Sequence, residues 1–333
     1  MNGSNGKFWA DRNVFITGCT GLLGSWLTEA LVNHGANVVG LVRDRVPRSR
    51  LVQSGLIDRI SVVSGEVEDY LLLERALNEY QVQTVFHLAA QTIVGIANQS
   101  PLSTFDTNIR GTWQLLEACR RTSWVEAVVL ASSDKAYGEH SELPYSETFP
   151  LEGRHPYDVS KSCADLISQA YAKSYGLPVC VTRCGNLFGA GDINFNRLIP
   201  GTIRSVIRDE PPVIRSDGKF SRDYVYVEDA AEAYILLAEA MVDRSAMHGE
   251  AFNFSYERPL SALEVVENIL SQMDRTDLNP EILNTTENEI PHQFLSSEKA
   301  RQMLDWRPKF EFDEGLRRTI PWYKDLLAER SVL

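Results

Sequence analysis

The sequence predicts an α/β protein built on a doubly wound parallel sheet, with a smaller, interleaved lobe towards the C-terminus. Short Val- and Ile-rich runs alternate with amphipathic segments through the first half of the chain. That alternation is typical of a parallel sheet covered by helices on both faces. A glycine-rich turn, 18–24, directly follows the first run and opens the first helical segment. A turn in this position links a strand to a helix in such folds.

Each element is predicted from its own run of residues. Strands are expected where apolar and β-branched residues stand together, over 14–17, 38–42, 60–63, 84–88, 127–131 and 178–182. Helices are expected where apolar residues recur every three to four positions, over 22–33, 71–80, 107–121, 157–175 and 230–241. The segment 185–222 is richer in Gly, Pro, Asn and Arg and is expected to be loop-rich and to face the substrate. Residues 224–227 are expected to rejoin the sheet, and residues 260–333 to form the smaller helical lobe.

Composition argues against several kinds of partner. The net charge of −12 argues against a nucleic-acid or membrane surface, because both are anionic. No apolar run approaches the roughly 18 residues of a membrane span. The five cysteines form no CxxC pair, which fits free thiols in a reducing compartment, so we expect a cytoplasmic protein. The six histidines show no metal-ligand spacing, and no metal is predicted.

The glycine turn predicts a dinucleotide site of the Rossmann type, because its backbone N–H groups can approach a pyrophosphate. The turn consists of Gly18, Cys19, Thr20, Gly21, Leu22, Leu23 and Gly24. Where NAD-selective folds end the second strand with an acidic residue, this chain has Val42 followed by Arg43. Arg43 slightly favours NADP, since an arginine can bind a 2′-phosphate, although Asp44 is close enough to reach a ribose hydroxyl. Glu66 and Val67 follow the third strand, where an adenine would be capped.

Tyr157 and Lys161 are the candidate pair for oxidising an alcohol. Their i,i+4 spacing places both side chains on one face of a helix, where the ammonium can lower the pKa of the tyrosine from about 10. A tyrosinate there can remove a hydroxyl proton while hydride leaves the same carbon. Ser133, at the end of the strand 127–131, completes the set.

Asp134 and Lys135 directly follow Ser133 and add an acid and an amine to the same cleft. A plain dehydrogenase has no use for them, so they indicate proton transfer at a second carbon. A base role requires Lys135 to be partly neutral, which burial and the nearby Lys161 cation favour. The alternative is an ordinary ion pair at the end of a strand.

The chain resembles the extended short-chain dehydrogenase/reductase family, in its nucleotide-sugar epimerase and 4,6-dehydratase branch, over nearly its whole length. The segments that carry the resemblance are the glycine turn, 86–91, 108–112, 157–161, 222–227, 304–308 and 315–316. Dehydratases of this branch carry Ser/Thr-Asp-Glu or Ser/Thr-Asp-Lys where simple epimerases have small or apolar residues after the serine. Ser133-Asp134-Lys135 resembles the lysine version found in CDP-glucose 4,6-dehydratases, as do 183–192 and 197–200. Val42-Arg43 is similar to the same position in NADP-binding GDP-mannose dehydratases, so the nucleotide base stays open between cytosine, guanine and another base.

The resemblance implies the remaining site residues and the assembly. It implies that the cofactor also contacts Leu88, Ala89, Ala90, Gln91, Asn108, Tyr157 and Lys161. It implies a nucleotide-diphosphate sugar held by Gln91, Ser133, Asn186, Arg197 and Arg222, with arginines focused on the phosphates of an acidic protein. A homodimer formed through helices 107–121 and 157–175 is expected. The domains are then a dinucleotide-binding part, 1–184 with 223–257, and a nucleotide-sugar-binding lobe, 185–222 with 258–333.

The resemblance also implies a reaction, an NDP-hexose 4,6-dehydration with CDP-glucose as the favoured substrate and tightly bound NAD(P). In this reaction C4 is oxidised, Lys135 removes the C5 proton, Asp134 protonates the leaving C6 hydroxyl, and hydride returns to C6. Two alternatives stay open. One is a nucleotide-sugar epimerase that uses the same transient oxidation, and the other is a non-catalytic NAD(P)-binding sensor.

Overall fold

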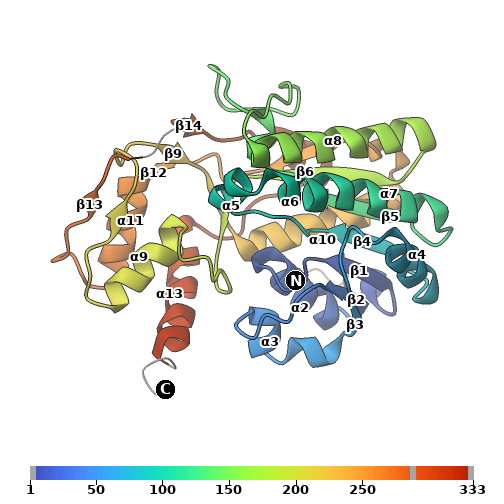
Figure 1. Cartoon of the computed structure of the whole chain (residues 1–333), viewed down its shortest axis with the longest axis horizontal. Helices are drawn as coiled ribbons and strands as arrows, with labels where there is room; N and C mark the ends of the chain where they lie inside the picture. Colours follow the sequence, from blue (N-terminus) through green and yellow to red (C-terminus); the bar gives the residue numbers. More distant parts are fainter. Residues whose placement is uncertain (1–4, 286–289, 329–333) are drawn as a thin grey trace.

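The structure, a computed structural model, describes residues 5–285 and 290–328. Within these residues a seven-stranded parallel sheet has the order β11-β6-β5-β4-β1-β2-β3 (Figure 1). Its strands are β1 Asn13–Thr17, β2 Asn37–Val42, β3 Ser61–Ser64, β4 Thr84–His87, β5 Ala127–Ala131, β6 Val179–Cys184 and β11 Ala251–Phe254. The predicted doubly wound α/β fold is confirmed.

Helices cover both faces of this sheet, which is why its central strands are buried along almost their whole length. One face carries α2 (Leu22–Asn33) and α10 (Val227–Asp243). The other face carries α4 (Tyr70–Glu79), α7 (Gly111–Arg121) and α8 (Pro156–Tyr175). The predicted helices over these residues are confirmed, with ends that differ by a few positions.

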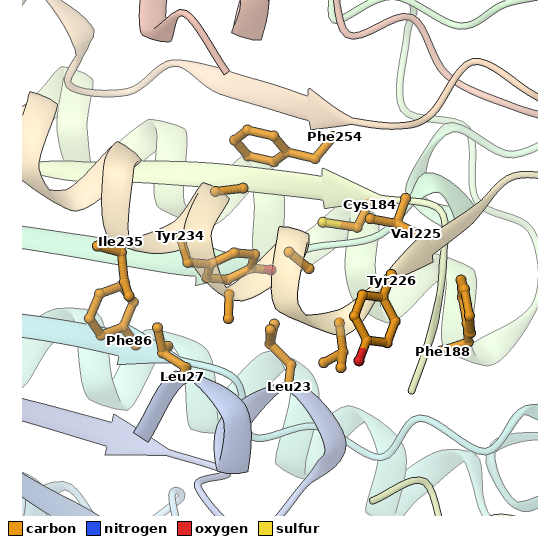
Figure 2. Packing of buried hydrophobic residues seen from close by; sticks show 14 of the residues in the cluster. Leu23, Leu27, Phe86, Cys184, Phe188, Val225, Tyr226, Tyr234, Ile235 and Phe254 are labelled. Atoms are coloured by element: carbon orange, nitrogen blue, oxygen red, sulfur yellow. The ribbon is translucent and has the colours of Figure 1, made fainter. Parts of the chain in front are cut away.

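Figure 2 shows how the first face is filled. Leu23 and Leu27 of α2 point towards Tyr234 and Ile235 of α10, and Phe86 of β4 lies against the same cluster. Apart from the slightly exposed Leu23 and Ile235, these side chains are at most 2% exposed. Burying apolar surface stabilises the fold by about 25 cal/mol per Å². The packing of α2 on α10 therefore holds the start of α2, and with it the glycine turn, in place on the sheet.

Shorter helices connect the strands. They are α1 Asn5–Trp9, α3 Arg50–Gln53, η1 Leu56–Arg59, α5 Val94–Gln99, α6 Pro101–Phe105, η3 Asp134–Tyr137 and η4 Ser245–Met247. The predicted helix 107–121 is not continuous. A π-helical turn, η2 (Asp106–Arg110), precedes α7, and such turns insert an extra residue into a helix, often at functional sites.

A second lobe lies beside the sheet, on the left of Figure 1. Its helices are α9 Leu198–Ile207, α11 Ala262–Gln272 and α13 Phe312–Ala328. Short strands accompany them: β7 Asn186–Phe188, β8 Val213–Ile214, β9 Ser221–Arg222, β10 Tyr224–Tyr226, β12 Leu260–Ser261, β13 Glu281–Ile282 and β14 His292–Gln293. The helix α12 Glu298–Leu304 packs instead beside α10 and β11 of the main sheet. The helical character predicted for the described part of 260–333 is confirmed for the larger elements.

Two expectations for the middle of the chain are wrong. Residues 224–227 do not rejoin the main sheet, because β10 pairs with β7 in a separate sheet and β11 takes the place beside β6. The aromatic rings of β10 pack instead on Phe188 and Phe312. The segment 185–222 also contains the helix α9, whose Pro200 near its start and Gly201 concealed it in the sequence. The division into two domains stays a prediction.

Across the part of the chain that the structure describes, no helix combines the length and the apolar character that crossing a membrane requires.

Candidate active site

The glycine turn between β1 and α2 packs against the segment after β4. Gly18 has a φ of 75°, and a Cβ atom there would lie 2.8 Å from the backbone of Leu88 and Ala89. A Cβ on Gly24 would lie 2.1 Å from the carbonyl oxygen of Gly18. Gly21 is exposed at the start of α2, where no side chain caps the helix. The first N–H groups of α2 therefore face a cradle suited to a pyrophosphate.

The residues predicted to select the cofactor lie at the ends of β2 and β3. Arg43 is exposed, and its Nε lies 2.6 Å from Oδ2 of the exposed Asp44. Val67 is buried and lies against Gly111, where an added Cβ would come within 2.5 Å of its side chain. Glu66 is exposed. Arg43 thus stands at the correct strand end for a ribose contact, with its guanidinium turned to a neighbouring carboxylate.

His87, for which the sequence predicted no role of its own, lies at the centre of a buried hydrogen-bond chain. Its Nδ1 is 2.8 Å from Oγ1 of Thr17, and its Nε2 is 3.0 Å from Oγ1 of Thr112. Thr112 Oγ1 donates to the Asn108 carbonyl, so it accepts from His87, whose Nε2 carries the proton. Burial, together with the charge of Lys161, lowers the pKa of His87 to about 3. The ring is therefore neutral.

Asn108 joins the segment after β4 to α8, the helix that carries Tyr157. Its Oδ1 accepts from the Gln91 N–H at 2.7 Å. Its Nδ2 donates to the Gln91 carbonyl at 3.1 Å and to Ser160 Oγ at 2.9 Å. Ser160 donates in turn to the carbonyl of Tyr157. The π-helical turn η2 places this amide inward, so the position of Tyr157 depends on it.

Tyr157 lies in the first turn of α8, which begins with Pro156 at a position where proline is favoured. Burial raises the pKa of Tyr157 to about 12, opposed by its hydrogen bond with Ser133 and by the charge of Arg197. Lys161 is buried one turn later and donates to the Ala131 carbonyl at 2.8 Å. Burial lowers the pKa of Lys161 to about 8, and Asp165 opposes that effect.

The structure brings Ser133, Tyr157 and Lys161 together, as the sequence predicted. The pKa of Tyr157 is raised to about 12 and not lowered from 10 as expected, because burial of the tyrosine outweighs its hydrogen bond with Ser133 and the charge of Arg197. The Lys161 ammonium is directed to the end of β5.

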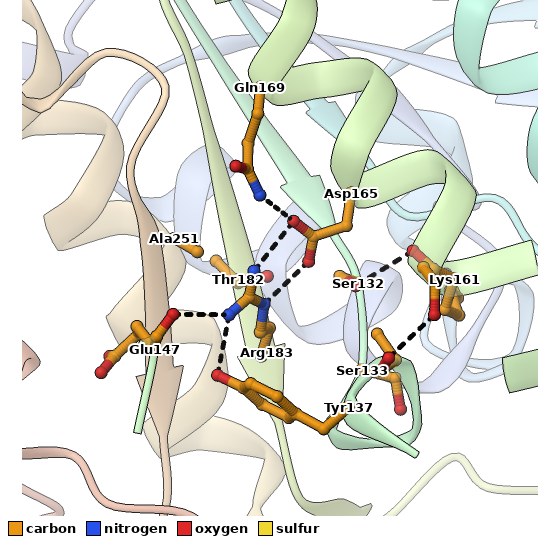
Figure 3. Close-up of polar contacts among 12 residues, drawn as sticks. Ser132, Ser133, Tyr137, Glu147, Lys161, Asp165, Gln169, Thr182, Arg183 and Ala251 are labelled. Carbon is orange, nitrogen blue, oxygen red and sulfur yellow. Dashed lines mark hydrogen bonds and ion pairs between the residues drawn. The ribbon is translucent and has the colours of Figure 1, made fainter. Parts of the chain in front are cut away.

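A buried ion pair between Arg183 and Asp165 lies next to α8, the helix that carries Tyr157 and Lys161 (Figure 3). Arg183 of β6 donates to both carboxylate oxygens of Asp165 on α8, at 2.8 Å and 3.0 Å. It also donates to Tyr137 Oη at 2.8 Å, and Tyr137 donates to Asn253 of β11. Arg183 and Asp165 are almost fully buried, so each compensates a charge that would otherwise be costly. The network ties α8 to two strands of the sheet and to η3.

Asp134 and Lys135 begin η3 directly after Ser133. Ser133 Oγ donates to Asp134 Oδ1 at 2.9 Å and accepts from the Lys135 N–H at 3.2 Å. The Lys135 Nζ donates to Oε1 of Gln293 at 2.6 Å. Gln293 comes from β14, in the second lobe, and is fully buried. The pair thus shares Ser133 with Tyr157 and receives a second contact from a distant part of the chain.

Two residues of this region were missed. Gln293 carries no sequence signal, because a single glutamine at the end of a loop has no motif. Asp158 stood inside the Tyr157–Lys161 motif, and its own chemistry was not considered. It is buried, which raises the pKa of its carboxyl, while the charges of Lys135 and His155 lower it and that of Asp134 raises it. Asp158 therefore lies within electrostatic range of the acid and amine pair.

The predicted phosphate-binding residues occupy the junction with the second lobe. Asn186 begins β7. Arg197 precedes α9, with Nη1 3.2 Å from Oδ2 of Asp192, and its charge reaches Tyr157. Arg222 of β9 is buried, and its Nη1 donates to the carbonyls of Ser221 at 2.9 Å and Pro291 at 3.0 Å. The structure therefore sets Arg197 towards the tyrosine and holds Arg222 within a strand pair.

The five cysteines are unpaired by disulfides, and burial raises the pKa of Cys19 and Cys184 to about 12. Among residues 5–285 and 290–328, no group of three or more His, Cys, Asp or Glu side chains has a metal-binding arrangement.

A tyrosine and a lysine one helical turn apart, beside a dinucleotide-binding glycine turn, define the short-chain dehydrogenases/reductases, and the second lobe places this chain among the extended ones. A family model described as GDP-mannose 4,6 dehydratase matches residues 15–319, and the chain belongs to that family. The resemblance stated from the sequence is confirmed.

Individual relatives share the fold and divide between two activities. The chain is 31% identical over 343 residues to the CDP-glucose 4,6-dehydratase of Salmonella typhimurium, covering 98% of this chain and 94% of the relative. The structure of dTDP-glucose 4,6-dehydratase from Bacillus anthracis, in complex with NAD, matches with a TM-score of 0.83 and 28% identity over 94% of this chain and 97% of that one. The UDP-glucose 4-epimerase of Thermotoga maritima, with UDP-glucose, matches with a TM-score of 0.85 and 26% identity over 95% and 99%. The fold alone does not separate dehydratases from epimerases.

Proposed function

We propose that the protein is an NDP-hexose 4,6-dehydratase, a hydro-lyase that converts a nucleotide sugar to the NDP-4-keto-6-deoxy sugar, with CDP-glucose as its substrate. The observation that supports this most is the Asp134–Lys135 pair, which shares Ser133 with Tyr157. These groups add proton transfer to a site already equipped for hydride transfer. The Salmonella relative, a CDP-glucose 4,6-dehydratase, supports the choice of nucleotide.

The cradle at the start of α2 fits a dinucleotide, since glycine is required at Gly18 and Gly24 by contacts that a side chain would break. Bound NAD(P) supplies the acceptor for hydride from sugar C4 and the donor of hydride to C6. The turn 18–24 would hold the pyrophosphate, with Leu88, Ala89, Ala90, Gln91 and Asn108 lining the nicotinamide side and Glu66 and Val67 the adenine side. NAD is supported by the Bacillus anthracis structure.

Arg43 is the residue that tests NADP against NAD. The sequence slightly favours NADP, and the Arg43–Asp44 ion pair would have to open for the guanidinium to reach a 2′-phosphate. Mass spectrometry of the coenzyme released from the denatured protein would identify it. Retained NAD would make Arg43 an ordinary surface charge, whereas retained NADP would require that Arg43→Ala weakens its binding.

In the first chemical step, Tyr157 Oη takes the proton of the C4 hydroxyl, with Ser133 as its hydrogen-bond partner. A buried tyrosine with a pKa near 12 holds its proton firmly, so removal requires a nearby positive charge when the substrate is bound. Lys161 can supply one by turning from the Ala131 carbonyl. Asn108 keeps α8 aligned through Ser160 during this step.

In the second step, the 4-ketone makes the C5 proton acidic, and Lys135 Nζ removes it. Asp134 gives a proton to the departing C6 hydroxyl, which leaves as water. Asn186, Arg197 and Arg222 hold the diphosphate, and Gln91 and Ser133 contact the sugar. Hydride taken from C4 is returned to C6, Lys135 gives its proton back to C5, and the proton taken by Tyr157 replaces the one that Asp134 gave up. The sum is the loss of one water with no net redox change.

The assembly is proposed to be a homodimer formed through α7 and α8. The supporting observation is that large apolar side chains on these helices are exposed: Trp113 at 42%, Leu166 at 54% and Tyr175 at 61%. Light scattering of the wild type and of Leu166→Lys would test it, with a dimer and a monomer expected. A cytoplasmic location is proposed from the unpaired cysteines.

The second candidate is a nucleotide-sugar 4-epimerase, favoured by the match to the Thermotoga maritima epimerase. Both activities begin with oxidation at C4, and they differ in what happens to the keto sugar. The purified enzyme would be incubated separately with CDP-glucose, GDP-mannose, UDP-glucose and dTDP-glucose and the products weighed by mass spectrometry. A loss of about 18 mass units, one water, from one donor is the expected result. An isomer of unchanged mass would establish the epimerase instead.

A further inference from the structure

Gln293 of the second lobe contacts both Asp134 and Lys135, the two residues proposed for elimination. It lies on β14 with no exposed surface. Its Oε1 accepts from the Lys135 Nζ at 2.6 Å, and its Nε2 donates to the Asp134 carbonyl at 2.9 Å. Both bonds span about half the chain, with sequence separations of 158 and 159. The amide therefore bridges the two residues at the start of η3.

The hydrogen-bonding needs of the Lys135 ammonium and the Asp134 carbonyl explain why residue 293 is an amide. A lysine ammonium only donates and a backbone carbonyl only accepts, so the bridging side chain needs one acceptor and one donor. Glutamine meets this need in a single orientation. An ionised glutamate would accept from Lys135, yet it would face the Asp134 carbonyl with a second acceptor. It would also place a full negative charge on the amine and so favour the ammonium, the wrong form for a base.

The backbone of β14 links this contact to the predicted phosphate site. β14 pairs in parallel with β9, and Gln293 stands opposite Arg222 in the register. Arg222 Nη1 donates to the carbonyl of Pro291, just before β14. One strand pair thus carries both the residue proposed to hold the diphosphate and the side chain that holds Lys135.

We propose that Gln293 is a positioning residue for Lys135, holding the amine at the sugar with a neutral acceptor and joining the diphosphate-binding strand pair to the elimination step. This inference rests on the proposed dehydratase function. It assigns to the second lobe a part in the chemistry as well as in substrate binding.

The test compares Gln293→Glu and Gln293→Met with Gln272→Met as the matched control. Gln272 lies on α11 of the same lobe, and its Nε2 donates to the Asp313 carbonyl at 3.0 Å, so the control makes the same chemical change away from η3. Gln293→Met is expected to slow water loss about tenfold to hundredfold, with KM changed less than about threefold. Reduction of the bound coenzyme in a single turnover should persist.

Gln293→Glu separates positioning from packing. A carboxylate at the amide's place should raise the pKa of Lys135, so the rising limb of kcat against pH should move up by about one pH unit. Equal slowing of coenzyme reduction and water loss in Gln293→Met, with an unmoved limb in Gln293→Glu, would show that Gln293 only packs the interior and would overturn the proposal.

A measurement without substrate tests the role of Gln293 separately from the proposed dehydratase function. Trace acetylation across pH, followed by mass spectrometry, reports the titration of each lysine in the folded protein. The pH of half-labelling at Lys135 should rise in Gln293→Glu, while exposed Lys173 on α8 stays as in the wild type. An unmoved Lys135 would overturn the contact itself. A wild-type enzyme that removes water from none of the four donors would overturn the dehydratase function, and with it the role of Gln293 in elimination.

Discussion

The residues proposed for hydride transfer, Tyr157 and Lys161, and the pair proposed for elimination, Asp134 and Lys135, meet at Ser133 near the end of β5, but different parts of the chain hold them. Tyr157 and Lys161 are held by Asn108 and by the Asp165–Arg183 ion pair, within the dinucleotide-binding fold. Lys135 is held by Gln293 from the second lobe. The difference teaches that the dinucleotide-binding fold holds Tyr157 and Lys161 by its own hydrogen bonds, with the lobe adding the charge of Arg197, whereas the proposed elimination base takes a direct hydrogen bond from the lobe.

Replacing Tyr157 by Phe should produce the largest effect, because it removes the proton acceptor on which both steps depend. We expect kcat for water loss to fall about 10⁴-fold, the upper end for a general base, with no reduction of bound coenzyme. Product mass and coenzyme absorbance would be measured together. Tyr175→Phe, on the exposed end of the same helix, is the control. Retained coenzyme reduction in Tyr157→Phe would place the base elsewhere.

Replacing Lys135 by Met should slow water loss without stopping the reduction of the coenzyme. Water loss is expected to fall about 10²–10³-fold, because the C5 proton has lost its acceptor, while the coenzyme is still reduced by the sugar. Stopped-flow absorbance with mass spectrometry would show the split. Lys219→Met, an exposed lysine of the lobe, should behave as the wild type. Intact turnover in Lys135→Met would return the Asp134–Lys135 pair to a structural role.

Replacing Arg183 by Met tests the support behind the hydride-transfer side. It leaves Asp165 buried without its cation, so the free energy of unfolding should fall by about 3–5 kcal/mol. Denaturant unfolding would measure it. Arg75→Met breaks an exposed i,i+4 pair and should cost no more than about 0.5 kcal/mol. Similar losses in both variants would mean that the buried pair contributes little to this side of the site.

The smallest of these expected effects is the contribution of the neutral, buried His87 to the pH dependence of the free energy of unfolding. Its folded pKa of about 3 lies below the ordinary 6.5, so below pH 6.5 the unfolded chain binds a proton that the folded chain does not. Stability from this group is therefore complete above pH 6.5 and declines as pH falls towards 3. Between pH 7.5 and 5 the wild type should lose about 2 kcal/mol more than His87→Gln.

Unfolding curves at the two pH values would give this difference. His292→Gln, at an exposed histidine, should lose as much stability on acidification as the wild type does. Parallel losses in the wild type and His87→Gln would mean that His87 takes up a proton in the folded protein.

The sequence was sufficient for the parts that local pattern determines. The strand 127–131 and the helix 22–33 match the structure at both ends, because buried parallel strands and a glycine turn leave strong signals. The candidate residues Ser133, Tyr157 and Lys161 meet for the same reason: one strand end and one helix carry them all. Their roles stay predictions until the variants are measured.

What the sequence did not reveal depends on distant contacts. The pairing of β10 with β7 and the arrival of Gln293 at Lys135 are decided by tertiary packing, and nothing within a few residues of either segment indicates it. The pKa of Tyr157 was misjudged because helical spacing places Lys161 on the same face without showing how deeply the tyrosine is buried. Sequence spacing predicts which side chains share a helix face, while their hydrogen-bond partners and burial depend on the whole fold.

The π-helical turn η2 also sets the phase of the helices that flank it. An α-helix turns about 100° per residue, so one extra residue rotates everything beyond it by that angle. This rotation lets Asn108 face Ser160 inside the protein while Trp113, a few residues later, faces outward on α7. Deleting a single residue from Asp106–Arg110 would put these two side chains out of step. Either Asn108 would no longer reach Ser160, or Trp113 would no longer face outward on α7.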